Sequence, residues 1–525
     1  MQKTHSIKTT HAVITTPQAD ATEAGNAILK EGGTAIDAMI AAGAMLSVTS
    51  PHMVGLGGDA LWMLHNGSDI STILGIGQAG RQLPTSGRIQ RRGEDAIATT
   101  AAAMASWDTA YRISQNRWNS RIPWSRLLEP AIDKARNGFA VSDSQLFWQS
   151  QRKTLVSEFP DLHTMWCKQS GQALVEGDQL LLPALANSLE SLSRYGAMSF
   201  YTGELGHALA EGFAKRNLCL TLQDLEETRA PEQAPISISY RYGQLYNVAP
   251  PCQGITTLQG MALLNQFPIA TLRNQPADYY HLMVEAIKSA LKQRNRALCD
   301  PAFCELDVHA WLSAYSSDTR LIDPSKAADW KDQAQPADTA WMAAIDSYGN
   351  GASLIQSLYY DWGSACTIGD TGILWQNRAA GFSPLPTHPN AWAPGKRPAH
   401  TLNPSLYIGN NGERVLFGSQ GGDGQPQTQT VLATQLIDFG NSLEEVLYAP
   451  RFLLGRSFFD SADNLKIEAH LAADVIQQLR DYGHDIEVIP KLSPLAGLAG
   501  VARSHHDGTC EAMHDPRGSG LTLGF

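Results

Sequence analysis

The spacing of apolar residues predicts helices through much of the first two-thirds of the chain. Residues 17–33 begin with a proline, which the first turn of a helix tolerates well, and end with two glycines, which favour termination. Residues 34–49 are apolar on nearly every side, so the helix that they predict should be buried. Helical patterns dominate from about residue 99 to residue 217, and residues 277–300 predict one long amphipathic helix.

Apolar runs on both sides of short turns predict strand hairpins over residues 60–77, 236–251 and 339–360. The first of them turns at Asn66-Gly67, a pair that favours tight hairpin turns. After residue 400 the two patterns alternate, with helices expected at 425–440 and 471–483 and strands at 464–468, 485–490 and 499–505. This mixture predicts β-sheets packed between layers of helices.

Composition and charge narrow the classes of function. The 525 residues carry 40 basic and 51 acidic side chains, and the formal charge of −11 disfavours nucleic acid or an anionic membrane as a partner. The first twenty residues lack the apolar segment of a signal peptide. The most apolar stretch contains Asp37 and is too short to span a bilayer. We therefore expect a soluble, cytoplasmic protein.

Cysteine and histidine spacing indicates neither a metal site nor a cofactor. The seven cysteines are odd in number and form no C-x-x-C pair, so we expect reduced thiols rather than disulfides or a zinc site. His400, His505 and His506 lack metal-binding spacing, and adjacent residues of one strand point to opposite faces. Residues 75–80 match G-x-G-x-x-G, but Pro84 follows where a dinucleotide-binding helix should run, so a tight turn is the better interpretation.

The junction at Thr339 is the first candidate for chemistry. A polar, proline-marked linker ends at Asp338, and Thr339 opens an apolar strand. A threonine in a strand is usually there for its β-propensity. Here, however, Ser357 lies on the returning strand, within reach of Thr339. Cleavage before Thr339 would also create an α-amine, with a pKa of about 7.7–8.0, beside a hydroxyl. Such an amine can act as the base for its own threonine nucleophile.

A glycine-rich turn over residues 418–430 is the second candidate. A strand runs into the glycines and a helix follows, an arrangement that can aim successive backbone N–H groups at one point. Such a turn could bind an anion or serve as an oxyanion hole. Taken alone, the segment is better explained as a flexible glycine-rich loop.

Six segments place these candidates in a known family. In chain order they are EGGTAIDAMIAAGAMLSVTSPHMVGLGGDALWML, DTAWMAAIDSYGNGASLIQS, GDTGILWQNRAAGF, APGKRPAHTLNPSL, GSQGGDGQPQ and APRF. On these segments the chain resembles the γ-glutamyltranspeptidase family of N-terminal-nucleophile hydrolases. The resemblance implies the α+β class, as a four-layer αββα sandwich, and a precursor that cuts itself between Asp338 and Thr339. Residues 1–338 and 339–525 would remain associated as large and small subunits.

The same resemblance assigns the catalytic roles and implies no cofactor. Thr339 stands at the position of the family's nucleophile, and Ser357 stands where a hydroxyl hydrogen-bonds that nucleophile. Gly421 and Gly422 match the backbone oxyanion donors, and loss of one such donor typically costs about 10²–10³ in rate.

Departures from the family pattern change the expected substrate. Where transpeptidases grip the α-amino group of a glutamyl substrate, this chain has Arg378, Gly381 and Tyr359, and the family's paired carboxylate-binding serines correspond to His400 and Thr401. The segment that corresponds to the family's lid loop is also shorter. A guanidinium binds carboxylates and repels ammonium groups. We therefore expect a substrate with a carboxylate near the scissile carbonyl and no α-amine, which disfavours glutathione.

This combination resembles the oxamate amidohydrolases of bacterial urate and allantoin breakdown, so hydrolysis of oxamate to oxalate and ammonia is the favoured activity. A glutaryl or cephalosporin acylase and a γ-glutamyl hydrolase or transpeptidase are alternatives. Another is an uncut, non-catalytic binding relative, because Ala340 and Trp341 replace the Thr and His of many members. Arg88 lies near the family's carboxylate-binding arginine, although a solvent-exposed arginine is the simpler interpretation. Assembly of processed heterodimers into a higher homo-oligomer stays open.

Overall fold

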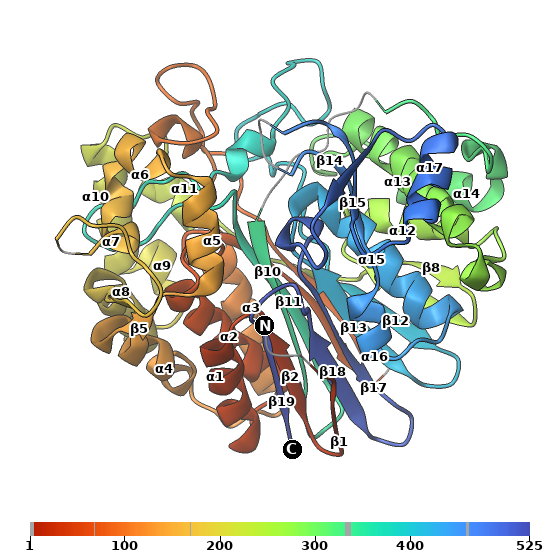
Figure 1. Cartoon of the computed structure of the whole chain (residues 1–525). Helices are drawn as coiled ribbons and strands as arrows, with labels where there is room; N and C mark the ends of the chain where they lie inside the picture. The colour runs from red at the N-terminus through yellow and green to blue at the C-terminus, as the bar shows by residue number, and fades with distance from the viewer. Residues whose placement is uncertain (1–4, 68, 169, 331–337, 458–460) are drawn as a thin grey trace.

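Two seven-stranded sheets stack face to face between two layers of helices in the computed structural model (Figure 1). The structure describes residues 5–67, 69–168, 170–330, 338–457 and 461–525. Helices of the N-terminal part cover one sheet, and helices from residue 254 onward cover the other. The predicted four-layer αββα sandwich of the α+β class is thus confirmed.

The first sheet holds the strand that begins at the predicted cleavage site. All its neighbouring strands are antiparallel. Its order is β19 (Leu521–Gly524), β2 (Val13–Thr16), β10 (Asp338–Ile345), β11 (Gly351–Tyr359), β3 (Asp59–Asn66), β4 (Asp69–Gly75), β7 (Glu232–Gln233).

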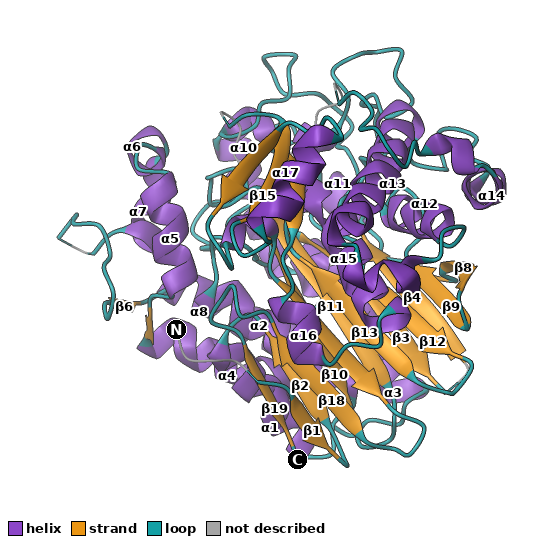
Figure 2. Cartoon of the chain, turned by 45° about the vertical axis from the view of Figure 1, so that its right-hand side comes forward, coloured by secondary structure: helices purple, strands orange, loops and turns teal. Residues whose placement is uncertain are grey.

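The second sheet is also antiparallel throughout. Its order is β1 (Ile7–Thr9), β18 (Cys510–His514), β17 (Ala499–Ser504), β13 (Arg414–Ser419), β12 (Ser405–Gly409), β9 (Gly243–Asn247), β8 (Ile236–Tyr240). Figure 2 shows the strands of the two sheets running side by side, with helices on the outer faces.

The helices that cover the first sheet come from the N-terminal part of the chain. They are α1 (Ala19–Lys30), α2 (Ala35–Thr49), α3 (Ala103–Asn116), α4 (Trp124–Asn137), α5 (Asp143–Gln151), α6 (Leu155–Glu158), α7 (His163–Trp166), α8 (Pro183–Tyr195), α9 (Ser199–Thr202), α10 (Glu204–Lys215) and α11 (Leu222–Glu226). Every residue of α2 is buried, as its apolar pattern predicts, and Thr34 and Asp37 form a capping box at its start.

The helices on the other side are α12 (Gly254–Leu264), α13 (Pro276–Ala297), α14 (Val308–Ser317), α15 (Gln425–Ala433), α16 (Leu443–Tyr448) and α17 (Ala473–Asp481). Two small sheets complete the fold, one of β5 (Phe139–Ala140) and β6 (Gln179–Leu180), the other of β14 (Phe452–Gly455), β15 (Asn464–Glu468) and β16 (Ile486–Ile489). In the part of the chain that the structure describes, no helix combines the length and the apolar character needed to cross a bilayer.

Packing between the sheets fixes the strand that carries Thr339. Trp341, Ala343 and Ile345 of β10 join the apolar layer between the two sheets, whereas the alternate residues of the strand join the core under the helices. The Trp341 ring needs glycines opposite it, because a Cβ at Gly418 or Gly500 would come within 2.2 Å of its ring atoms. A strand held this tightly keeps Thr339, its second residue, in a fixed position.

Most predicted elements are confirmed, with some differences. The three hairpins form. No helix follows directly after the 75–80 glycines, which agrees with the rejection of a dinucleotide site, but these residues form no tight turn, and Ala79 instead bridges to Thr99. The helix predicted over 425–440 is α15 followed by a π-helical turn, Thr434–Asp438. The expectation that all cysteines are reduced is wrong for one pair, because Cys299 and Cys304 form a disulfide, while the other five are free. The odd total concealed a local pair only five residues apart.

Candidate active site

Thr339 is fully buried at the start of β10. The strand register pairs Asp338 with Tyr359 and Ala340 with Gln356. Between these pairs Ser357 and Leu358 of β11 lie opposite Thr339 alone, so β11 carries the extra residue of a bulge. The Thr339 hydroxyl donates a hydrogen bond to Ser357 Oγ at 3.3 Å, and the Tyr359 N–H donates to the same oxygen at 2.8 Å. Asp338 and Thr339 are consecutive residues of β10, so this is the structure of the uncut chain.

The glycine turn lies at the end of β13, in the opposite sheet. Gly421 and Gly422 have φ values of 112° and 55°, in the left-handed region that favours glycine. The side-chain amide of Gln253 donates to the carbonyls of Gly422 and Thr401, each at 2.7 Å, and so fixes the turn. Within the described part of the chain, the N–H groups of Gly421 and Gly422 donate no hydrogen bond. They are therefore available to a negatively charged oxygen.

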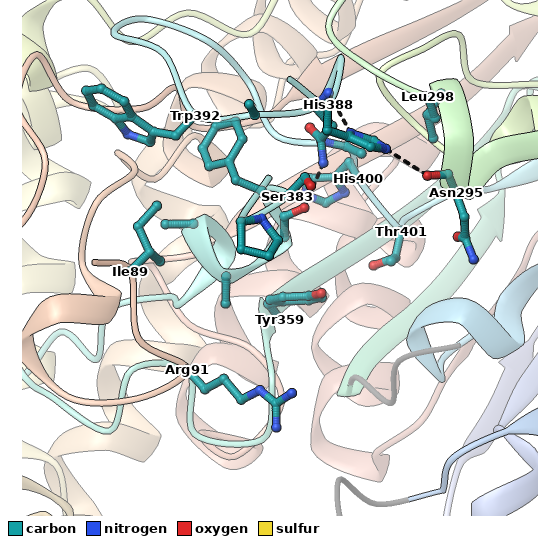
Figure 3. A pocket seen from close by; sticks show the side chains of 18 of the residues that line it. Ile89, Arg91, Asn295, Leu298, Tyr359, Ser383, His388, Trp392, His400 and Thr401 are labelled. Atoms are coloured by element: carbon teal, nitrogen blue, oxygen red, sulfur yellow. Dashed lines mark hydrogen bonds between the residues drawn. The ribbon is translucent and has the colours of Figure 1, made fainter. Parts of the chain in front are cut away.

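A cavity of about 1050 Å³ adjoins these elements (Figure 3). Tyr359, His400 and Thr401 line it, together with Gly381 and Asp423. Apolar side chains form another part of its wall: Ile89, Leu298, Phe382 and Trp392. The exposed Arg88 also lines the cavity. The other predicted site residues whose side chains the structure describes do not line this cavity: Thr339, Ser357, Arg378, Gly421 and Gly422.

Arg378 lies behind the cavity wall and is fully buried. Its guanidinium carbon is 3.9 Å from the centre of the Tyr359 ring, a cation–π contact. Nη1 donates to Thr401 Oγ1 at 3.3 Å, whereas Nε and Nη2 have no hydrogen-bond partner in the described structure. Burial lowers the pKa of Arg378, and nearby Tyr359 and Asp59 oppose that shift. The guanidinium is therefore poorly paired, and it is complementary to an anion.

Asp59, at the start of β3, organises the polar groups around Arg378. Its Oδ1 accepts hydrogen bonds from the N–H groups of Gly77 at 2.9 Å and Ala102 at 3.1 Å, and from the Gln376 amide at 3.0 Å. Its Oδ2 lies 3.1 Å from His400 Nε2 and 3.9 Å from Arg378 Nε. The carboxylate is thus already well solvated by protein donors and is only a distant partner for Arg378.

The ring of His400 is held as one neutral tautomer. The Leu402 N–H donates to His400 Nδ1 at 3.2 Å, so Nδ1 accepts and Nε2 carries the proton that faces Asp59. Burial and the neighbouring Arg378 lower the pKa of His400 to about 4, although Asp59 opposes the shift. At neutral pH His400 is therefore a hydrogen-bond donor to Asp59 and contributes no positive charge.

Arg294 connects α13 to the glycine turn. Its Nη2 donates to Asp423 Oδ2 at 2.9 Å and its Nη1 donates to Gln253 Oε1 at 2.8 Å. All three of these residues line the cavity. The pair places opposite charges on the wall beside Gly422 and braces the turn from the helical side.

Sequence reasoning missed Asp59, Gln253, Arg294 and Asp423. Asp59 is the one acidic residue in an apolar segment, which is a usable indication of a buried polar role. Arg294 gives no such indication, because it lies at the end of an amphipathic helix where a solvated arginine is expected. Only the fold brings it to the cavity.

A buried cluster away from this cavity has residues that metals favour. Ligand atoms of His281, Glu285 and His484 lie within 4.8 Å of one another. Bonds within the protein account for the cluster, since His281 Nδ1 lies 2.9 Å from His484 Nε2, and Glu285 accepts from Lys288 Nζ at 2.8 Å and from the Ala328 N–H at 3.0 Å. The lysine cation also disfavours a divalent ion there.

Comparisons with known proteins agree with the fold and the motifs. The gamma-glutamyltranspeptidase family model matches residues 21–525. The chain is 38% identical to the oxamate amidohydrolase proenzyme of Klebsiella pneumoniae, covering 98% of this chain and 99% of that protein. It is 33% identical to a glutathione hydrolase-like proenzyme of Bacillus subtilis, with 99% of each covered. A cephalosporin acylase from Bacillus halodurans superposes with a TM-score of 0.91 at 27% identity, covering 100% of this chain and 98% of that one.

Proposed function

The chain belongs to the gamma-glutamyltranspeptidase family, and from this membership we propose that it is a precursor that cuts itself and then hydrolyses an amide. The observation that carries the proposal is the hydroxyl of Thr339, the second residue of the rigid strand β10. It is hydrogen-bonded to Ser357 and directly follows the bond to be cut. Relatives named as proenzymes at 38% and 33% identity support it.

In the self-cleavage that we propose, Thr339 Oγ1 adds to the carbonyl carbon of Asp338. The bond from that carbon to the Thr339 nitrogen breaks, which leaves an ester and a free α-amine. Water then hydrolyses the ester, giving the Asp338 carboxylate and restoring the Thr339 hydroxyl. Ser357, which accepts from the Thr339 hydroxyl, would orient the attacking oxygen.

In the mature enzyme the Thr339 α-amine would accept the hydroxyl proton while Oγ1 adds to the substrate amide. The tetrahedral oxyanion would be bound by the N–H groups of Gly421 and Gly422. The amide nitrogen would leave with a proton, and water would release the acyl group from Thr339. No step in this cycle requires a cofactor.

We propose that the two subunits, residues 1–338 and 339–525, stay together after cleavage. Strands from the two sides of the cut pair with one another in both sheets: β10 pairs with β2, β11 pairs with β3, and β12 pairs with β9. Separation would expose the sheet edges and the apolar core between the sheets. A cytoplasmic location stays a prediction.

Oxamate is the substrate that we favour, because it carries a carboxylate directly on a primary amide. Arg378 and Thr401 would donate to the substrate carboxylate, and His400, whose Nε2 proton faces Asp59, would line the same subsite. Hydrolysis would yield oxalate and ammonia. The similarity to an oxamate amidohydrolase proenzyme supports this choice. The same arginine would repel the ammonium group of a γ-glutamyl substrate, which disfavours glutathione.

An acylase acting on a larger carboxylate-bearing amide is the second candidate. The cavity of about 1050 Å³, with an apolar wall that includes Phe382 and Trp392, is much larger than oxamate requires. The superposition on a cephalosporin acylase supports the same reading. Glutaryl amides would use both the arginine and the apolar wall.

Denaturing gels and ammonia assays test the proposal together. Active wild type should run as two chains, and mass spectrometry should place the cut before Thr339. The Thr339→Ala variant should stay one chain without turnover. Ammonia release from oxamate, glutamine and primary glutaryl amides, with glutamate release from glutathione, should rank the substrates. An active wild-type enzyme that remains a single chain would contradict self-cleavage, and an uncut, inactive one would favour the non-catalytic alternative.

A further inference from the structure

Arg378 is placed to bind a carboxylate but is shielded from the cavity in the uncut chain. It is fully buried, and its Nε and Nη2 donate no hydrogen bond within the described residues. Within the described residues, its one ion-pair partner is Asp59, whose Oδ2 is 3.9 Å from Nε and already lies 3.1 Å from His400. Such a cation gains strongly from a bound anion, because burial has removed its water without supplying a close counter-charge.

The ring of Tyr359 is the shield. It lies 3.9 Å from the Arg378 guanidinium carbon, and Tyr359 lines the cavity whereas Arg378 does not. Figure 3 shows the Tyr359 ring on the wall near Thr401, whose hydroxyl accepts from Arg378. A carboxylate in the cavity would thus meet an aromatic face, which carries partial negative charge, before it met the guanidinium.

The uncut chain also holds Tyr359 in an unfavourable backbone conformation. Its φ of 81° is in the left-handed region, which a bulky residue rarely adopts. Tyr359 is the strand partner of Asp338, the residue whose carbonyl would be attacked in self-cleavage. Its N–H is bonded to Ser357 Oγ, which also accepts from the nucleophile.

We infer that cutting the Asp338–Thr339 bond releases Tyr359 from its partner on β10 and uncovers Arg378, so that the carboxylate subsite is completed only in the cleaved enzyme. The inference rests on the proposed function. Hydrolysis of that one peptide bond consumes one water and yields the Asp338 carboxylate and the Thr339 amine. The same event would therefore free the catalytic base and open the anion subsite, and the uncut precursor would bind carboxylate substrates weakly.

Oxalate binding to cleaved and uncut protein tests the inference, because oxalate offers carboxylates without an amide to hydrolyse. Calorimetry should show binding to cleaved wild type that is at least about tenfold tighter than binding to the uncut Thr339→Ala variant. In the uncut background, Tyr359→Gly should restore binding, since glycine accepts the backbone conformation and removes the ring. The matched change Tyr359→Phe keeps the ring and should leave binding weak, and Arg378→Met should abolish binding in the cleaved enzyme.

A second measurement does not depend on the folding of the double variants. Phenylglyoxal modifies accessible arginines, and peptide mapping of Thr339→Ala and of cleaved wild type should find Arg378 modified only in the cleaved protein. Equal oxalate affinity of cleaved and uncut proteins, or equal modification of Arg378, would overturn the inference. So would a cleaved, active enzyme that binds oxalate equally well with Arg378→Met. An uncut, inactive wild type would instead contradict the proposed function itself.

Discussion

Two fully buried guanidinium groups, those of Arg378 and Arg517, have opposite surroundings. Arg517 donates from Nε to Glu468 Oε1 at 2.8 Å, from Nη1 to the Leu447 carbonyl at 2.7 Å, and from Nη2 to the Ala449 carbonyl at 2.9 Å. Among the described residues, Arg378 has one hydrogen bond, of 3.3 Å, to Thr401. Burial acts against the charge of both, but Asp515 and Glu468 raise the pKa of Arg517, whereas the pKa of Arg378 is lowered.

The difference separates an arginine that holds the fold from one that awaits a ligand. Donors saturated by carboxylates and carbonyls leave nothing for an anion to gain. Unpartnered N–H donors alone do not identify a ligand-binding arginine, since Arg451 also has Nε and Nη2 atoms without a hydrogen-bond partner. Arg451, however, is directly ion-paired to Asp515 through Nη1. What sets Arg378 apart is that, among the described residues, its ion-pair partner Asp59 comes no closer than 3.9 Å.

The largest effect on stability is expected for Arg517→Met. Removing the guanidinium leaves Glu468 buried without its ionic partner, and breaking one side of a buried pair typically costs about 3–5 kcal/mol. Urea unfolding followed by circular dichroism should measure this loss. Arg503→Met is the matched control, because Arg503 pairs with Glu511 nearer the surface and should cost at most about 1 kcal/mol. Equal losses of unfolding free energy in the two variants would show that the buried pairing of Arg517 has no special structural role.

Arg378→Met should instead impair turnover. The variant replaces a poorly paired cation by an apolar side chain of similar length, so the free energy of unfolding should change by no more than about 1 kcal/mol. Lost charged hydrogen bonds to a carboxylate are worth about 1.5–3 kcal/mol, so kcat/KM for oxamate should fall roughly 10- to 100-fold, mainly through KM. Self-cleavage should proceed normally. A loss of stability as large as that of Arg517→Met would show that Arg378 is structural.

The sequence predicts the strands and turns that carry this site better than it predicts the burial and pairing of the charged residues. The hairpin over 339–360 follows from two apolar runs around a turn, and it implies that Thr339 and Ser357 lie near each other. Left-handed glycines at 421 and 422 follow from a strand that runs into a glycine cluster. These features are local, so the order of residues suffices to predict them.

The rest depends on segments that only the tertiary fold brings together. Along the chain, Asp59 is 319 residues before Arg378 and 341 residues before His400. These three residues meet, and are buried, only because the two sheets stack on each other. The position of Arg378 behind Tyr359, rather than on the cavity wall, likewise has no counterpart in the residue pattern. The Cys299–Cys304 pair was missed because a count of cysteines ignores local proximity.

The pH dependence of stability should reveal the neutral His400. Its folded pKa of about 4 lies below the usual 6.5 of an unfolded histidine, so only the unfolded chain gains this proton between those values. The stabilisation is complete above pH 6.5 and is lost as pH falls toward 4, with a slope of up to about 1.4 kcal/mol per pH unit. In urea unfolding from pH 7 to 4.5, His400→Asn should lose stability less steeply than wild type. Parallel curves would mean that burial and Arg378 do not hold His400 neutral.

The smallest effect on kcat/KM is expected for Arg88→Ala. Unlike Arg378 and Arg517, Arg88 has its guanidinium exposed to water. Arg88 lines the cavity but is exposed, so solvent and salt screen its charge. Steady-state kinetics should show kcat/KM for oxamate lowered by no more than about twofold at low salt, and the difference should vanish near 0.5 M salt, an ionic strength at which exposed charges are largely screened over roughly 4 Å. A tenfold loss of kcat/KM that persists at high salt would place the substrate carboxylate on Arg88 instead. The unpartnered Nε and Nη2 of Arg378 would then not be the carboxylate-binding groups.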